Sequence, residues 1–213
     1  MATIKQGILG AFSGKVGSVV GSSWKGISIM KSLPPSVSNP RTAGQIVQRS
    51  KMASCVRAAN SILAEVIKPL NDRFVSRRSG YNDFVSRNIS LFNDEGLVSP
   101  ANLKISQSRN KAQLIDAIAA GELSKSLLVE WTSDEGQGFA LPSDIAFIVC
   151  YNRRLKEFFG FRTTEVREGE EASVAFPEGV LLEGDVIDVY LAFLRADGTV
   201  VFDTAYATGT VGA

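Results

Sequence analysis

The stretch 186-VIDVYLAFLRADGTVVFDTAY-206 decides the fold of this chain. β-Branched and aromatic residues dominate both of its halves, and such residues favour strands. Between the halves lies Asp197-Gly198, a dipeptide that favours a tight hairpin turn. The stretch therefore predicts two antiparallel strands, Val186–Leu194 and Thr199–Tyr206.

Upstream of this hairpin, further short strands are predicted from Ser99-Pro100 onward. They are Leu103–Gln107, Gln113–Ala119, Leu127–Thr132, Asp144–Tyr151, Glu157–Arg162 and Ala172–Phe176. Short strands at this spacing are typical of an immunoglobulin-like β-sandwich, here without the disulfide of that fold. We expect such a sandwich over residues 99–213, with the acidic loop Glu165–Glu171 at one end.

The middle of the chain has a helical pattern. Asn39-Pro40 is a good N-cap and first-turn pair, and apolar residues then return at helical spacing. We expect one long helix over Pro40–Asn71, interrupted near Pro69, because the proline ring removes a backbone hydrogen bond. Ser79 is expected to cap a shorter helix over Tyr81–Ser90. Together the two helices predict a helical hairpin.

The opening of the chain is rich in glycine and does not have the composition of a helix. Its glycines are Gly7, Gly10, Gly14, Gly17, Gly21 and Gly26. We expect two short strands, Lys15–Val20 and Trp24–Met30, around a turn at Gly21-Ser22-Ser23. A two-stranded ribbon is marginally stable in water, so this hairpin is expected to lie against the rest of the chain or another subunit.

The predicted fold class is therefore α+β, in three consecutive segments. Residues 1–38 form a glycine-rich β-hairpin arm, residues 39–98 a basic helical hairpin, and residues 99–213 an immunoglobulin-like β-sandwich.

The charge of the chain is divided unevenly along its length. Residues 1–112 carry 16 Lys and Arg against 5 Asp and Glu, whereas residues 113–213 carry 7 against 17, although the net charge is only +1. A basic surface attracts phosphates or acidic protein, and an acidic surface repels them. The chain is thus expected to bind nucleic acid or a neighbouring copy of itself.

Two interfaces follow from this division. The basic one is predicted at Lys15, Trp24, Lys25, Arg41, Arg49, Arg57, Arg73, Arg77, Arg78 and Arg87. The acidic one is predicted at Glu165, Glu168, Glu170 and Glu171. Residues 40–90 hold seven Arg against two Lys, which favours a specific interface over a merely solvated face, because arginine makes bidentate contacts and is less strongly hydrated.

The absence of histidine removes many enzyme classes. A Ser-His-Asp triad, a Cys-His pair and a histidine metal site are all excluded within one chain. Gly10–Val16 resembles a phosphate-binding loop, but Leu9 replaces its first glycine and Val16 its Ser or Thr. The acidic residues lack the spacing of a calcium loop. We therefore expect no catalytic residues, no metal, no cofactor and no enzymatic activity.

The composition also bears on compartment. No apolar run approaches the ~20 residues that span a bilayer, and no leader pattern follows Met1. The chain is expected to have no membrane span and to stay in the cytoplasm unless it is packaged into a virion. Cys55 and Cys150 are expected to be buried thiols, although the sequence leaves open whether they pair.

Three motifs make the chain similar to a family of uncharacterised proteins. They are Gly10-Ala11-Phe12-Ser13-Gly14-Lys15-Val16-Gly17, Val20-Gly21-Ser22-Ser23-Trp24-Lys25-Gly26 and Asn39-Pro40-Arg41-Thr42-Ala43-Gly44-Gln45. An aromatic second helix like Tyr81–Phe84 and a β-rich end resembling Val189–Gly198 complete the likeness. The family resembled is found in Bacteroidetes genomes and their phages. The resemblance implies an association with phages or mobile elements and implies no catalytic residues.

These observations favour a non-enzymatic structural protein that self-assembles, such as a ring, connector or tail protein of a phage virion. Its partners would be copies of itself and other virion proteins, and it would assemble in the host cytoplasm. One alternative is a nucleic-acid-binding protein that grips phosphates with the basic helical hairpin. Another is a module that binds a carbohydrate or host surface, for which Phe158, Phe159 and Phe161 are the candidate aromatic residues.

Overall fold

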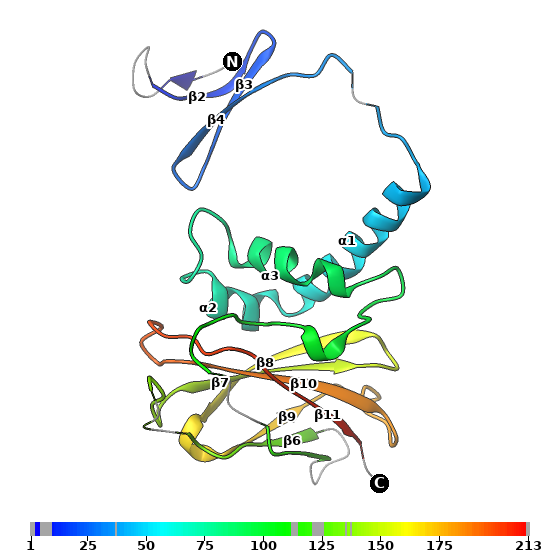
Figure 1. The fold of residues 1–213 in the computed structure, drawn as a ribbon, viewed down its shortest axis with the longest axis vertical. Helices are drawn as coiled ribbons and strands as arrows, with labels where there is room; N and C mark the ends of the chain where they lie inside the picture. Colours follow the sequence, from blue (N-terminus) through cyan, green and yellow to red (C-terminus); the bar gives the residue numbers. More distant parts are fainter. Residues whose placement is uncertain are drawn as a thin grey trace. The chain divides into compact units, whose positions relative to one another are not determined.

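The computed structural model describes residues 3–4, 10–36, 38–111, 115–120, 126–134, 136 and 138–211. The chain forms a β-rich α+β fold made of two compact units (Figure 1). The N-terminal unit comprises residues 1–46 and 76–78, and the C-terminal unit comprises residues 47–75 and 79–213. The predicted boundary at residue 99 falls inside the C-terminal unit, which holds helices as well as sheets.

The N-terminal unit contains an antiparallel sheet rather than a single hairpin. Its strands, in spatial order, are β1 (Thr3–Ile4), β2 (Phe12–Val16), β3 (Val19–Trp24) and β4 (Ile27–Ser32). Lys25 and Gly26 join β3 to β4 with φ values of 45° and 80°, the left-handed pair that a tight hairpin turn requires. The predicted turn at Gly21-Ser22-Ser23 is wrong, because these residues lie inside β3.

Gly21 is a packing glycine and not a turn glycine. It pairs with Gly14 across β2 and β3, and it is the buried residue of β3. A Cβ atom at this position would overlap the carbonyl oxygen and the ring of Phe12. Glycine is needed at this position so that the Phe12 ring can lie over β3. The local sequence Gly21-Ser22-Ser23 does not distinguish such a packing position from a turn.

The helices of the chain are α1 (Ala43–Ser61), the π-helix η1 (Leu63–Ile67), α2 (Lys68–Asn71) and α3 (Gly80–Asn88), followed by 3₁₀ turns at Ile89–Leu91 and Pro100–Asn102. The predicted helix over 40–71 is therefore broken before Pro69. In η1 the Ile67 N–H donates to Ile62 O, five residues back, at 3.1 Å. Ser79 caps α3 as expected, since its hydroxyl accepts from Asn82 N at 3.2 Å.

Two antiparallel sheets complete the C-terminal unit. The four-stranded sheet has the order β11 (Ala205–Thr210), β10 (Val186–Leu194), β7 (Ile145–Asn152) and β8 (Glu157–Val166). The three-stranded sheet has the order β5 (Ala117–Ala120), β6 (Ser126–Glu130) and β9 (Glu171–Ala175). The first residues of the predicted strand 113–119 lie outside the described residues.

The hairpin predicted from residues 186–206 forms, but its second strand starts late. β10 pairs with β11 from Leu191↔Ala205 to Val186↔Thr210. Phe202 N still donates to Phe193 O of β10 at 3.0 Å, whereas its carbonyl accepts from Ser106 Oγ at 2.7 Å. Asp203 and Thr204 also bond to the segment 104–110. The predicted strand Leu103–Gln107 is therefore wrong, because side chains rather than a regular ladder hold this segment.

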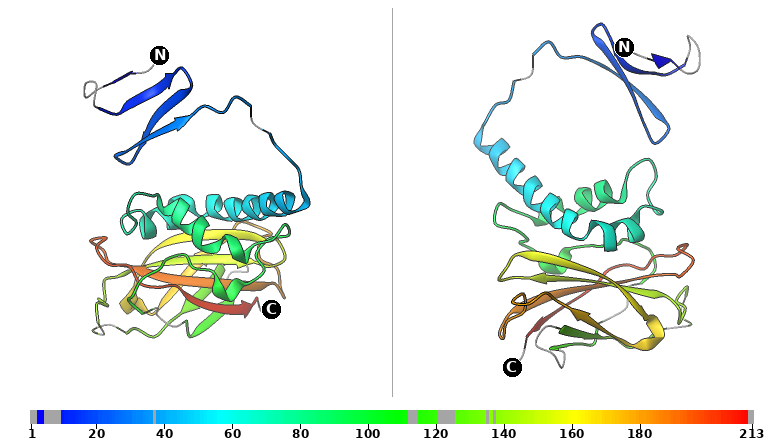
Figure 2. Two further views of the ribbon diagram at one scale, coloured as in Figure 1. Left: turned by 45° about the horizontal axis from the view of Figure 1, so that its top comes forward. Right: turned by 180° about the vertical axis from the view of Figure 1, so that it is seen from behind.

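The central strands of the four-stranded sheet, β7 and β10, are buried on both faces. Helices cover one face and the three-stranded sheet covers the other (Figures 1 and 2). Along β7, Phe147 and Val149 point toward the helical layer, whereas Ile148 and Cys150 point toward the second sheet. This is why residues 145–150 show an unbroken apolar run without alternation.

The two thiols lie in different cores. Cys55 packs in the core beneath the helices, and Cys150 packs in the core between the two sheets. Both are buried and free, so they do not form a disulfide in this structure.

Candidate functional site

Strand pairing in the N-terminal sheet places exposed apolar and basic side chains on the same face. Lys15, Val20 and Lys31 are directly opposite one another on β2, β3 and β4, and Trp24 is opposite Ile27. Side chains alternate along strands, so one face presents Lys15, Val20, Trp24, Ile27, Ile29 and Lys31. We call it the tryptophan face. Trp24 is 51% exposed, Ile29 45% and Ile27 37%.

The opposite face of this sheet is also open. Met30 lies across from Gly21 and Gly14, and it is 69% exposed. Val16, near the end of the same face, is 56% exposed. A sheet with both faces open has almost no core of its own, and exposed apolar residues of this density mark interaction surfaces.

The charge of the N-terminal unit has a single sign. Its residues include seven Lys and Arg and no Asp or Glu, whereas the C-terminal unit has 16 basic and 22 acidic residues. The formal charges are therefore +7 and −6. The first carboxylate side chain of the whole chain is that of Glu65.

The ten predicted basic-interface residues are divided between the two units. Those of the N-terminal unit are Lys15, Trp24, Lys25, Arg41, Arg77 and Arg78. Within that unit the Lys25 ammonium donates to the carbonyl of Arg78. Those of the C-terminal unit are Arg49, Arg57, Arg73 and Arg87, all in or next to its helices.

Arg87 and Arg73 make contacts within the C-terminal unit. Arg87 forms an ion pair with Asp83 at 2.5 Å and donates to Asn71 Oδ1 at 2.6 Å. Arg73 donates to the carbonyl of Asp197 at 3.3 Å. The ion pair with Asp83 compensates the charge of Arg87, whereas Arg73 is exposed and keeps its charge.

Arg167 is the only basic residue in the sequence of the acidic loop Glu165–Glu171, and its side chain is buried. Arg167 is fully buried, and its guanidinium lies 4.1 Å from the ring centre of Phe193 and 4.3 Å from that of Phe202. It also pairs with Asp144 at 3.3 Å and with Asp134. The predicted acidic residues Glu165, Glu168, Glu170 and Glu171 all stay exposed around it. The outer surface of the loop is therefore more uniformly acidic than its sequence suggests.

The sheet register adds an acidic residue that the sequence pattern did not single out. Glu130 on β6 lies directly opposite Glu171 on β9. Like charges directly opposite each other on antiparallel strands repel, and a cationic partner would relieve that repulsion. Only the strand pairing brings these two glutamates together, because they are far apart in sequence.

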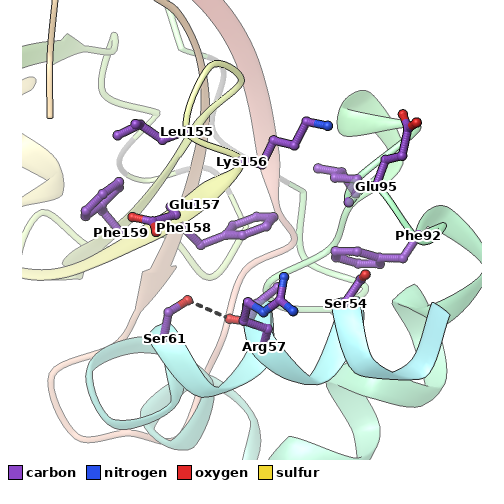
Figure 3. A pocket seen from close by; sticks show the side chains of 13 residues that line it. Ser54, Arg57, Ser61, Phe92, Glu95, Leu155, Lys156, Glu157, Phe158 and Phe159 are labelled. Atoms are coloured by element: carbon purple, nitrogen blue, oxygen red, sulfur yellow. Dashed lines mark hydrogen bonds between the residues drawn. The ribbon is translucent and has the colours of Figure 1, made fainter. Parts of the chain in front are cut away.

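A cavity of about 540 Å³ opens between α1 and the β7–β8 hairpin (Figure 3). In this view Arg57 and Ser61 on α1 face Lys156 and Phe158 on the hairpin. The Ser61 hydroxyl donates to Ala58 O at 2.9 Å. Phe92, Glu95 and Glu157 also line the cavity, so apolar rings and charges of both signs share its wall. The walls come from three distant segments, which sequence reasoning did not connect.

The aromatic residues that would suit a carbohydrate surface are used in packing. Phe158 is 6% exposed and belongs to the core beneath the helices. Phe159 and Phe161 stand edge-on to Phe176, at 5.4 and 5.2 Å between ring centres.

The buried thiols are poor nucleophiles. Burial raises the pKa of Cys55 to about 11 and raises the pKa of Cys150 further still. A thiol with a raised pKa holds little of the reactive thiolate. Within the described parts of the chain, no three metal-ligating side chains of the His, Cys, Asp and Glu types come together. None of the described helices is both long and apolar enough to cross a membrane.

Residues 11–208 match a protein family described as a family of unknown function, DUF6266. The chain belongs to this family. The expected membership of an uncharacterised family is thus confirmed, and the association with phages stays a prediction. Among solved structures, one titled "Myokine structure" is similar at 11% identity and a TM-score of 0.35, over 49% of this chain and 99% of that one. No curated protein matches the chain.

Proposed function

We propose that this protein is a non-enzymatic structural protein that assembles with copies of itself. The N-terminal unit of one copy would dock on the acidic surface of the C-terminal unit of the next. The observation that supports this proposal is the division of charge between the units, +7 without a carboxylate in one and −6 in the other. Opposite charges on two surfaces steer their encounter and fix their register.

An interface between two different surfaces repeats from copy to copy. It closes into a ring when the rotation between copies allows, and otherwise extends as a filament. Residues 33–36 and 38–42 between β4 and α1 have no regular secondary structure. A connection of ten residues spans at most about 35 Å. Such a connection would allow the N-terminal sheet to reach a neighbouring copy.

We also propose that the C-terminal unit carries an immunoglobulin-like sandwich. In that fold strands A, B and E share one sheet, and strands C, F and G share the other. β5, β6 and β9 match A, B and E, whereas β11, β10 and β7 match G, F and C. β8 follows C and lies beside it, the position of an added C′ strand. The helices are an addition to that fold, and they cover the outer face of the four-stranded sheet.

Phage rings, connectors and tail proteins are repeating assemblies of this kind. We propose such a virion as the place where the protein acts, assembled in the host cytoplasm together with other virion proteins. This part of the proposal rests on the sequence resemblance alone.

The test is the mass of the purified full-length protein by light scattering after size exclusion, at low and high salt. We expect a ring or polymer at low salt that dissociates at high salt, because salt screens exposed charges. Reversing charge in either partner surface should abolish assembly. The two variants are Lys15→Glu with Lys31→Glu, and Glu168→Lys with Glu171→Lys. All four positions are exposed.

Mixing the two variants provides the decisive control. In each variant alone, one docking surface has lost the charge that attracts its partner. In the mixture the altered lysine positions of one variant can face the altered glutamate positions of the other, so assembly should return. A variant with Asp94→Lys and Glu183→Lys carries the same charge change at exposed positions outside the acidic loop and should assemble. A monomer at every salt concentration, or variants that assemble like the wild type, would refute the proposal.

A further inference from the structure

We propose that the tryptophan face of the N-terminal sheet binds single-stranded nucleic acid. This activity goes beyond self-assembly, which requires only the basic charge of the unit. It also differs from an interaction through the helical hairpin, because it depends on Trp24 and its neighbours on β4.

Trp24 is the stacking element of this face. Trp24 is 51% exposed, although tryptophan residues are on average highly buried in proteins. Ile27 lies directly opposite it, and Ile29 follows on the same face of β4. These residues extend an exposed apolar surface beside the ring. Bases of every type stack on an exposed aromatic side chain, so this contact does not need a particular sequence.

Two lysines supply the phosphate contacts. Lys15 and Lys31 flank Val20 on the same face, one strand away on either side. Two strand spacings place their backbones about 10 Å apart, and Trp24 lies four residues along β3 from Val20, about 13 Å away. The face therefore offers a stacking site and two cations within the length of a few nucleotides.

The surroundings of this face do not repel a polyanion. The N-terminal unit contains no Asp or Glu, so no carboxylate of the unit opposes a phosphate backbone. The surface is a sheet with an exposed ring rather than a helix shaped for a groove. Bases in a duplex are already stacked on one another, whereas unpaired bases are free to stack on Trp24. The chemistry therefore favours a single strand.

The chain contains a built-in reporter for this interaction. It has two tryptophans, and Trp131 is 2% exposed while Trp24 is 51% exposed. A base that stacks on Trp24 should quench its fluorescence and leave that of Trp131 almost unchanged. We expect an unlabelled thymidine oligonucleotide, titrated into the full-length protein at low salt, to quench emission at the red, solvent-exposed edge of the spectrum.

Variants separate stacking from charge, with affinity measured by anisotropy of a labelled thymidine oligonucleotide. Trp24→Ala should weaken binding on the order of tenfold, as expected for the loss of one base stack. Lys15→Gln with Lys31→Gln should lower the slope of log affinity against log salt by about 1.4, which corresponds to two lost phosphate contacts. Met30→Ala, exposed on the opposite face, is the matched control and should bind like the wild type.

Polyglutamate distinguishes nucleic acid from acidic protein. Binding of polyglutamate as tight as that of the oligonucleotide, with no effect of Trp24→Ala on either, would overturn the proposal and assign the face to an acidic protein partner. Absence of quenching would overturn it as well. Trp24→Ala keeps the charge of the unit, so the variant should still self-assemble, and the two proposals can fail independently.

Discussion

At the residue scale, Arg167 shows how one side chain shapes both stability and surface. Its guanidinium packs against the rings of Phe193 and Phe202 and pairs with the buried Asp144. The Trp131 indole N–H donates to the Arg167 carbonyl at 2.9 Å and so ties down the backbone of the same residue. The loop around it is thereby anchored to the core, and its glutamates are left on the outside.

Removing the Arg167 side chain should destabilise the protein strongly. Arg167→Met leaves Asp144 buried without its cation, and breaking a buried pair in this way costs about 3–5 kcal/mol. The double variant Arg167→Met with Asp144→Asn should lose less, because no uncompensated charge remains at that position. Urea unfolding at pH 7 measures both. Arg109→Ala, at an exposed arginine, is the control and should change stability by less than about 0.5 kcal/mol. Equal losses in the single and double variants would contradict this account.

The lowered pKa of Asp185 should make the free energy of unfolding depend on pH in the acid range. Hydrogen bonds from Arg154, at 2.7 and 2.9 Å, lower the pKa of Asp185 from 3.8 to about 2, with further bonds from Asn152 and Leu182 N. The unfolded chain therefore binds this proton at a higher pH than the folded protein does. The stabilisation is complete above about pH 4 and is lost as the pH falls toward 2.

The variant Asp185→Asn tests this dependence. Its urea midpoint should lie below that of the wild type at pH 6, and the gap should narrow steadily once the pH falls below 4. Asp94→Asn, at an exposed position, should leave the midpoint almost unchanged at pH 6. A gap of constant size from pH 6 to pH 3 would show that the lowered pKa of Asp185 does not contribute to stability.

At the element scale, the contact between the helical layer and the four-stranded sheet depends on Gly160 in β8. A Cβ atom there would lie 3.0 Å from Ile62 Cγ2 and 3.0 Å from Val66 Cγ2. Ile62 directly precedes η1, and Val66 lies within it. The π-helical turn and the glycine therefore form a matched pair, in which the helix approaches the strand at the position that lacks a side chain.

Gly160→Ala should separate this helix from the sheet. Overpacking of a well-packed core costs about 1–3 kcal/mol, and we expect a loss in that range by urea unfolding. Gly169→Ala is the matched control, because its nearest neighbour would be Glu165 Oε2 at an ordinary 3.8 Å. Stability of Gly160→Ala equal to that of the control would mean that the helical layer shifts freely on the sheet.

At the scale of the whole molecule, the two units differ in what holds them together. The C-terminal unit has two hydrophobic cores, one on each side of the four-stranded sheet, whereas the described residues of the N-terminal sheet bury little apart from Gly21. Limited digestion with a nonspecific protease should therefore cut first within residues 33–42 and leave a resistant C-terminal fragment. Mass spectrometry identifies the first cut, and an initial cut within β7 or β10 would contradict the division into two units.

The sequence alone determined the elements whose signals are local. Asp197-Gly198 predicted the turn after β10, although β11 begins at Ala205 instead of Thr199, and Ser79 predicted the start of α3. The charge division was also visible, because it depends only on composition along the chain. Tyr81–Ser90, Asp144–Tyr151 and Glu157–Arg162 were placed nearly correctly, since each combines a periodic or apolar pattern with a clear boundary.

Only the tertiary structure decided the features that depend on residues distant in sequence. Gly21 signals a turn locally, but Phe12 on the neighbouring strand makes it a packing position. The segment 103–107 has the composition of a strand, but side-chain bonds to residues 202–204 hold it without a ladder. The tryptophan face and the Glu130↔Glu171 pair exist only through strand register. Register is set by pairing between strands, and a single strand carries no record of which residues lie opposite its own.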